Sequence, residues 1–116
     1  MGKRILIVDD SSLMRKMIRK TLEFDGHEIV GEATNGQEAI DKYKELKPEL
    51  VTMDVTMRGM DGFKAAQTIL DHDDAARIIF LSNLNKDKYE EDAANLGAIG
   101  YVNKHKSKQI LDLIND

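Results

Sequence analysis

Four short apolar runs, separated by intervals long enough for a helix, limit the folds that this chain can adopt. The runs cover residues 5–8, 50–53, 78–81 and 100–102. Runs of this length that are rich in β-branched residues are typical of strands buried on both faces of a sheet. A fifth segment, residues 28–33, is more polar, which favours a strand at the edge of that sheet.

Helical patterns fill the intervals between these runs. Ser11 or Ser12 can cap a first helix, whose apolar residues recur at helical spacing and which ends before Gly26. Further helices are predicted over residues 37–46 (with Pro48 at the exit), 63–70, 87–96 and 107–114. Strands that alternate with helices indicate βαβ units with right-handed crossovers. The sequence therefore predicts an α/β fold with a mainly parallel sheet.

Size and composition narrow the class of protein. A chain of 116 residues fits one domain, residues 1–116, that buries a core without disulfides, and it has no cysteine. No apolar run approaches the roughly 20 residues that a membrane span needs, and the start does not resemble a signal peptide. The net charge of -4 argues against a surface built for nucleic acid. We expect a soluble, cytoplasmic domain.

Polar side chains follow four of the five predicted strands, and the edge strand is the exception. They are Asp9 with Asp10, Asp54, Ser82, and Asn103 with Lys104. In an open parallel sheet, ligands bind outside the carboxyl ends of the strands. We therefore expect three carboxylates, a hydroxyl and an ammonium group on one rim of the sheet.

Such a set has a definite chemistry. Three carboxylates held close together repel one another and attract a cation, and hard oxygen ligands with open water positions suit Mg²⁺. A carboxylate such as Asp54 can attack phosphorus and form an aspartyl phosphate. Phosphoryl transfer also needs positive charge and hydrogen-bond donors around the phosphoryl oxygens, which Mg²⁺, Lys104 and Ser82 would supply.

Each of these residues also has a purely structural interpretation. Asp9 and Asp10 could cap a helix, and Asp54 could be a turn residue. Ser82 taken alone is most simply a turn hydroxyl, and Lys104 taken alone is a solvated surface amine. The functional interpretation depends on the joint pattern, because independent capping needs do not predict these residue types on these strands.

The order and spacing of several short motifs carry a family resemblance across essentially the whole chain. The motifs are ILIVDDSS at residues 5–12, EATNG at 32–36, MDVTM at 53–57 and MDG at 60–62, with Ser82 and Lys104. Together they resemble the receiver domains of response regulators. The resemblance implies a flavodoxin-like (βα)5 three-layer sandwich whose five-stranded parallel sheet has the order 2-1-3-4-5.

The resemblance also implies roles for individual residues. Asp54 matches the phospho-acceptor, and Asp9 and Asp10 match the acidic pair that holds Mg²⁺, with Asp10 the more direct ligand. The metal set would be completed by the backbone carbonyl of Thr56. Ser82 and Lys104 match the hydroxyl and the amine that contact the phosphoryl group. Tyr101 matches an aromatic residue that turns inward when Ser82 moves, although an ordinary strand aromatic is the alternative.

Three residues depart from the family pattern. Arg58 stands where the family usually has proline, and Asn83 is larger than the usual residue after the switch hydroxyl. His105 replaces the proline that usually follows the lysine in a cis peptide bond. Because a non-proline cis bond costs about 2.5–4 kcal/mol, we expect the Lys104–His105 bond to be trans. The three histidines, His27, His72 and His105, show no metal-ligand spacing and are expected at the surface.

The implied function is a phosphorylation-dependent switch of a two-component system. Such a protein is not an enzyme beyond its own phosphorylation and dephosphorylation. A sensor histidine kinase or a phosphotransfer protein would supply the phosphoryl group. A downstream protein would read the state: a motor switch, as in chemotaxis, a phosphatase or a relay protein. We expect a monomer that contacts neither nucleic acid nor membrane.

Three alternatives remain open. Arg58, Asn83 and His105 motivate a pseudo-receiver, an interaction module that works without phosphorylation. The chain could also be a receiver excised from a larger regulator. A metal-dependent phosphatase is less favoured, because the chain shows neither a substrate cap nor an additional acid or base.

Overall fold

Five strands alternate with five α-helices along the chain. The computed structural model describes residues 2–57, 59–82, 86–106 and 108–115. The strands are β1 (Arg4–Val8), β2 (Glu28–Ala33), β3 (Leu50–Asp54), β4 (Ile78–Ser82) and β5 (Gly100–Asn103). The helices are α1 (Ser12–Phe24), α2 (Gly36–Leu46), α3 (Gly62–His72), α4 (Lys86–Leu96) and α5 (Gln109–Asn115), and a 3₁₀ turn, η1 (Lys104–Lys106), which the sequence did not predict, precedes α5.

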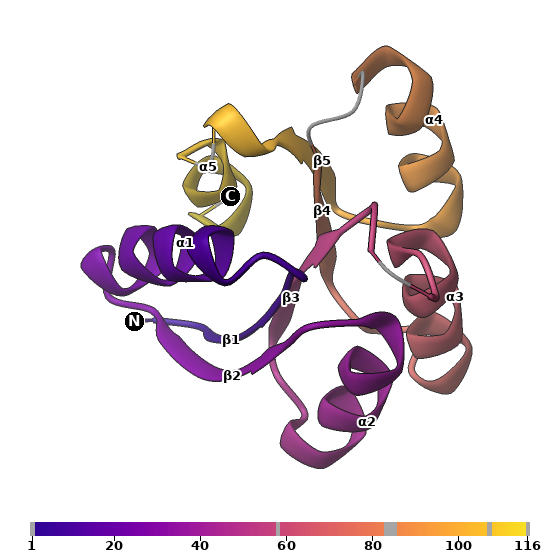
Figure 1. Ribbon diagram of the computed structural model, residues 1–116, viewed down its shortest axis with the longest axis horizontal. Coiled ribbons are helices and arrows are strands. Elements are labelled where there is room, and N and C mark those ends of the chain that lie inside the picture. The colour runs from indigo at the N-terminus through magenta and orange to yellow at the C-terminus, as the bar shows by residue number, and fades with distance from the viewer. Residues whose placement is uncertain (1, 58, 83–85, 107, 116) are drawn as a thin grey trace.

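The strands form one parallel sheet in the order β2-β1-β3-β4-β5. Helices α1 and α5 cover one face of this sheet, and α2, α3 and α4 cover the other (Figure 1). The predicted flavodoxin-like architecture and strand order are therefore confirmed. The more polar strand β2 lies at an edge, as its composition predicted.

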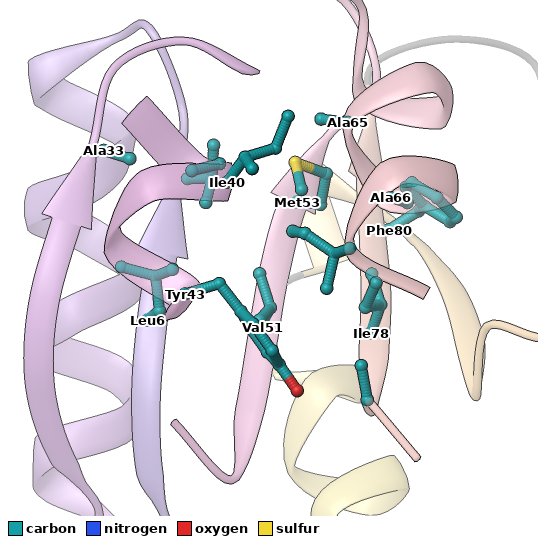
Figure 2. Close-up of a cluster of buried hydrophobic side chains, with 14 of the residues drawn as sticks. Leu6, Ala33, Ile40, Tyr43, Val51, Met53, Ala65, Ala66, Ile78 and Phe80 are labelled. Atoms are coloured by element: carbon teal, nitrogen blue, oxygen red, sulfur yellow. The ribbon is translucent and has the colours of Figure 1, made fainter. Parts of the chain in front are cut away.

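Each face of the sheet has its own hydrophobic core. Alternation along β1 sends Leu6 and Val8 to the α2–α4 side, and Ile5 and Ile7 to the α1–α5 side. Figure 2 shows the first core, where side chains of α2 and α3 meet those of β1, β3 and β4. Two packed layers hold the sheet between them, so the strands reach their carboxyl ends as a rigid frame.

Helix starts follow capping chemistry that is local in the sequence. Ser11, Asn35 and Asp61 are the N-caps of α1, α2 and α3, and each side chain accepts a hydrogen bond from the backbone N–H three residues later. Such caps satisfy donors that the first helical turn leaves without partners. The cap at Ser11 confirms the predicted start of the first helix.

Burial differs from the sequence prediction at two places. Only part of the apolar pattern of α1 faces the sheet: Ile18 and Leu22 are buried, while Leu13 and Met17 are exposed. His27 is buried rather than at the surface, and its Nδ1 accepts a hydrogen bond from the backbone N–H of Lys3 at 2.9 Å. A helix of a membrane-spanning length and hydropathy does not occur among the described residues.

Candidate functional site

Three aspartates meet at the carboxyl end of the sheet. Asp9 follows β1 and is 0 % exposed, Asp54 ends β3 and is 2 % exposed, and Asp10 is open to solvent. One carboxylate oxygen from each residue lies within 4.8 Å of the others. The folded chain thus brings together the three carboxylates that the strand ends predicted.

Lys104 lies between two of these carboxylates. Its Nζ is 2.9 Å from Asp9 Oδ2 and 3.2 Å from Asp54 Oδ2, and the residue is only 8 % exposed. The structural alternative of a solvated surface amine is therefore wrong. A buried ammonium group held between two buried carboxylates offsets part of their mutual repulsion.

Backbone groups hold the other oxygens of the two buried aspartates. The Ser11 N–H donates to Asp9 Oδ1 at 2.9 Å, and the Thr56 N–H donates to Asp54 Oδ1 at 3.2 Å. Gly62 keeps the segment after β3 close to the site, since a Cβ there would lie 2.1 Å from the Asp54 carbonyl oxygen. Any residue with a side chain at position 62 would push this loop away from Asp54.

The electrostatics of the site favour binding of a cation in addition to the charged Lys104 side chain. Burial and the negative charge of Asp9 raise the pKa of Asp54 to about 6, although Lys104 and the Thr56 N–H partly offset them. Burial lowers the pKa of Lys104, but Asp9 and Asp54 outweigh it, and the net pKa of the ammonium is raised. A charged lysine and two crowded carboxylates leave net negative charge in a buried place.

The donor atoms fit a hard divalent cation. Apart from their ion pairs with Lys104, Oδ2 of Asp9 and Oδ2 of Asp54 are buried and accept no hydrogen bond from a described residue. Asp54 and Lys104 line a hollow of about 360 Å³, and its lining also includes Asp10, Thr56 and Ser82. Carboxylate oxygens with room for water are the ligands that Mg²⁺ prefers.

Ser82 and Tyr101 lie beside this centre. Ser82 ends β4 and lines the hollow. Tyr101 lies on the neighbouring strand β5, where its register partner on β4 is Phe80. The Tyr101 hydroxyl is buried and lies close enough to Ser82 for that hydroxyl to lower its pKa, but no described residue makes a hydrogen bond of good geometry with it. Burial raises the pKa of this phenol, which keeps it protonated.

The residues that depart from the family pattern are only partly visible. Arg58 and Asn83 lie outside the described residues, as does the side chain of His105. No cis peptide bond occurs among the described residues, so the Lys104–His105 bond is trans. The Lys104 amine nevertheless reaches both carboxylates.

Two residues near the site were missed by the sequence reasoning. Arg15 donates to the backbone carbonyl of Asp9 at 2.7 Å, and Glu32 accepts from Arg15 at 2.9 Å. The available signal was weak: an arginine five residues after the acidic pair, and an acid on the adjacent strand. An arginine or a glutamate alone does not predict a site, because the sequence does not show which strands are neighbours.

A doubly wound parallel sheet with an aspartate–lysine centre at its carboxyl end defines a class of signalling domain. The family model described as "Response regulator receiver domain" matches residues 5–115. The chain therefore belongs to the response regulator receiver domain family. It is a phosphorylation-controlled signalling protein rather than an enzyme.

Individual relatives make the similarity more specific. The chain is 42 % identical to chemotaxis protein CheY of Thermotoga maritima over 99 % of this chain and 97 % of that protein. It is 45 % identical to chemotaxis protein CheY of Bacillus subtilis over the same shares. Among solved structures, the CheX–CheY–BeF3–Mg²⁺ complex from Borrelia burgdorferi matches with a TM-score of 0.90 and 32 % identity, covering 96 % of this chain and 85 % of that one.

Proposed function

We propose that Asp54 accepts a phosphoryl group from a phosphohistidine and that the acyl phosphate changes which proteins the chain binds. The observation that carries this proposal is the buried cluster of Asp9, Asp54 and Lys104, with Asp10 at its open side. Residues 1–116 would form one receiver domain. No single capping or turn requirement accounts for two buried carboxylates that share one lysine.

The transfer itself needs an ionised carboxylate and an open path to it. One Asp54 oxygen attacks phosphorus, a P–O bond forms, and the P–N bond of the donor breaks with its electron pair passing to the histidine nitrogen. Lys104 is close enough to Asp54 to stabilise the negative charge on the phosphoryl oxygens. The Thr56 N–H, already bonded to Asp54 Oδ1, orients the carboxylate.

Asp9, Asp10, Asp54 and the Thr56 carbonyl are the groups that would hold Mg²⁺. When bound, the cation supplies positive charge that neutralises the carboxylates and the phosphoryl oxygens. The chain's own residues prepare the place: Asp9 and Asp54 each keep one buried oxygen that, apart from its ion pair with Lys104, accepts no hydrogen bond from a described residue. Lys104 holds these two oxygens together before the cation arrives.

Ser82 and Tyr101 would couple the site to a binding surface. Tyr101 lines a hollow of about 520 Å³ between α4, β5 and α5, together with residues such as Ala94, Gln109 and Leu113. A phosphoryl group on Asp54 would attract the Ser82 hydroxyl and so alter the space that Tyr101 fills. Such a change shifts a pre-existing equilibrium between two surface conformations.

The partners that fit this function are proteins. A sensor histidine kinase or a phosphotransfer protein would donate the phosphoryl group. A motor switch, a phosphatase or a relay protein would bind the phosphorylated form, as CheX accompanies CheY in the Borrelia burgdorferi complex. We propose that the chain acts as a monomer in the cytoplasm.

Intact-mass analysis after incubation with Mg²⁺ and acetyl phosphate tests the proposal. We expect one phosphoryl adduct on the parent chain and none on Asp54→Asn or on the parent without Mg²⁺. Asp61→Asn is the matched control, because Asp61 is an exposed N-cap of α3 and asparagine caps equally well. This variant should label like the parent.

The opposite outcome is equally informative. If a folded, rapidly quenched parent shows no adduct, the phospho-acceptor role of Asp54 is wrong and a phosphorylation-independent interaction module becomes the better description. Turnover of a small phosphate ester would instead indicate a phosphatase.

A further inference from the structure

One arginine joins the acidic loop to the neighbouring strand. Arg15, in the first turns of α1, donates from Nη1 to the Asp9 carbonyl oxygen at 2.7 Å. The same guanidinium donates from Nε to Glu32 Oε1 at 2.9 Å, and Glu32 lies on β2. A planar guanidinium with two fixed partners has little freedom, so it restrains the loop between β1 and α1.

The bonded carbonyl belongs to the peptide group that links Asp9 to Asp10. Because a peptide group is planar, fixing the direction of this carbonyl fixes where the Cα of Asp10 lies. Asp9 has two further restraints, since its N–H donates to the Ala33 carbonyl at 3.0 Å and its Oδ1 accepts from Ser11. Arg15 therefore adds a third restraint, which acts on the peptide group that leads to Asp10.

Glu32 offsets part of the positive charge that Arg15 brings to the site. Glu32 also pairs with Arg19, whose Nη2 lies 2.7 Å from Glu32 Oε2. Burial raises the pKa of Glu32, but Arg19 and Arg15 outweigh it and the net pKa is lowered. An ionised Glu32 offsets positive charge that would otherwise repel a cation near Asp9 and Asp10.

We propose that Arg15 is a positioning residue for the divalent cation, holding Asp9 and Asp10 in the relative placement that cation binding needs. The inference rests on the proposed function, since it concerns the same site. Loss of a contact that orients a metal ligand commonly lowers metal affinity about 10–100-fold. Arg15 touches neither the phosphoryl path nor Lys104, so its effect should act on cation binding.

The direction of the effect separates this role from a purely electrostatic one. Removal of a positive charge near the carboxylates would, by charge alone, strengthen Mg²⁺ binding. Removal of a positioning contact weakens Mg²⁺ binding. A residue that only stabilises the fold would leave the affinity of the folded protein unchanged.

The test is a Mg²⁺ titration of the whole chain by calorimetry, with the Asp10 amide resonance followed by NMR. We expect Arg15→Ala to bind Mg²⁺ about tenfold more weakly than the parent. Arg19→Ala is the matched control, because Arg19 is on the same helix and bonds the same Glu32 without touching Asp9. It should bind within about twofold of the parent, well inside the effect expected for Arg15.

Labelling by acetyl phosphate gives a second measurement. Arg15→Ala should label slowly at low Mg²⁺ and approach the parent rate at saturating Mg²⁺. Arg15→Lys keeps the positive charge but loses the planar donor with two N–H directions, so it should also bind Mg²⁺ more weakly than the parent. This variant tests the role of Arg15 even if Arg15→Ala does not fold.

Equal or tighter Mg²⁺ binding by folded Arg15→Ala or Arg15→Lys, in a parent that binds Mg²⁺ and labels at Asp54, overturns the role of Arg15 alone. A parent that binds no Mg²⁺ overturns both this inference and the proposed function.

Discussion

The two ends of the sheet treat polar groups in opposite ways. At the carboxyl end, Oδ2 of Asp9 and Oδ2 of Asp54 are buried and, apart from their ion pairs with Lys104, accept no hydrogen bond from the part of the chain that the structure describes. At the amino end, Arg4 donates to the carbonyl oxygens of Leu46 and Lys47, both at 2.9 Å. One end holds buried polar atoms that accept no hydrogen bond from the described residues, and the other end satisfies the last carbonyls of a helix.

The carboxyl end of the sheet serves cation binding at a cost in stability, whereas the amino end contributes to stability. A buried polar atom without a hydrogen bond costs about 1–3 kcal/mol, so the carboxyl end lowers stability while it keeps ligands for a cation ready. Bonds at the amino end recover part of that cost. They include Tyr43 Oη to Asp73 Oδ2 at 2.8 Å, and the bond from the Lys3 N–H to His27. Substitutions at the two ends should therefore have opposite signs.

The largest effect on stability is expected from Asp54→Asn in the absence of Mg²⁺. The pKa of Asp54 is raised from 3.8 to about 6, so the ionised form is disfavoured in the folded state. The contribution of Asp54 to the free energy of unfolding is fully present below pH 3.8 and is lost as the pH rises through about 6. The variant should gain up to about 3 kcal/mol at pH 7.5 and almost nothing near pH 4.

Urea unfolding in EDTA at both pH values, followed by circular dichroism, measures this gain. Asp61→Asn serves as the control, because its carboxylate is exposed. A gain of the same size at both pH values would show that the ionised carboxylate is not the cause. Added Mg²⁺ should narrow the difference at pH 7.5, since it binds the folded parent.

Arg4→Met should have the next largest effect, with the opposite sign. Methionine keeps the apolar stem but loses both hydrogen bonds to the last carbonyls of α2, at a cost of about 1–2 kcal/mol. The loss should appear in urea unfolding, while labelling of Asp54 by acetyl phosphate stays at the parent rate. Slower labelling would mean that the two ends are coupled.

A matched pair of tyrosines compares the two ends with one chemical change. Tyr43 and Tyr101 are both 6 % exposed, but among the described residues only the Tyr43 hydroxyl makes a hydrogen bond of good geometry, to Asp73, whereas the Tyr101 hydroxyl has only Ser82 nearby. Tyr43→Phe should destabilise the protein by about 1 kcal/mol, and Tyr101→Phe should be neutral or slightly stabilising. Equal losses in thermal unfolding would contradict the contrast between the ends.

The smallest effect is expected at Thr52, inside β3. Its Oγ1 is buried between the neighbouring strands, opposite Ile7 and Ile79, and has no hydrogen-bond partner among the described residues. Thr52→Val should stabilise the protein by about 0.5–1 kcal/mol. Thr68→Val is the control, because the Thr68 hydroxyl donates to the Lys64 carbonyl, and it should not stabilise.

The sequence alone determined the kinds of elements and the chemistry at the strand ends. Apolar runs and helical spacing are local signals, so they predicted the strands and helices to within a few residues. The carboxylates, the hydroxyl and the lysine were visible because residues that end parallel strands must share one edge. The strand order came from family resemblance and was confirmed by the pairing.

How these groups meet depends on contacts between segments that are far apart in the sequence. Whether Lys104 is solvated or buried depends on contacts with residues 50 and 95 positions away, and no local pattern encodes such contacts. The burial of His27, the exposure of Leu13 and the bridge from Arg15 to Glu32 depend in the same way on which surfaces pack together. Hydrophobic periodicity specifies what a segment becomes, whereas packing across the chain specifies which polar atoms keep a partner.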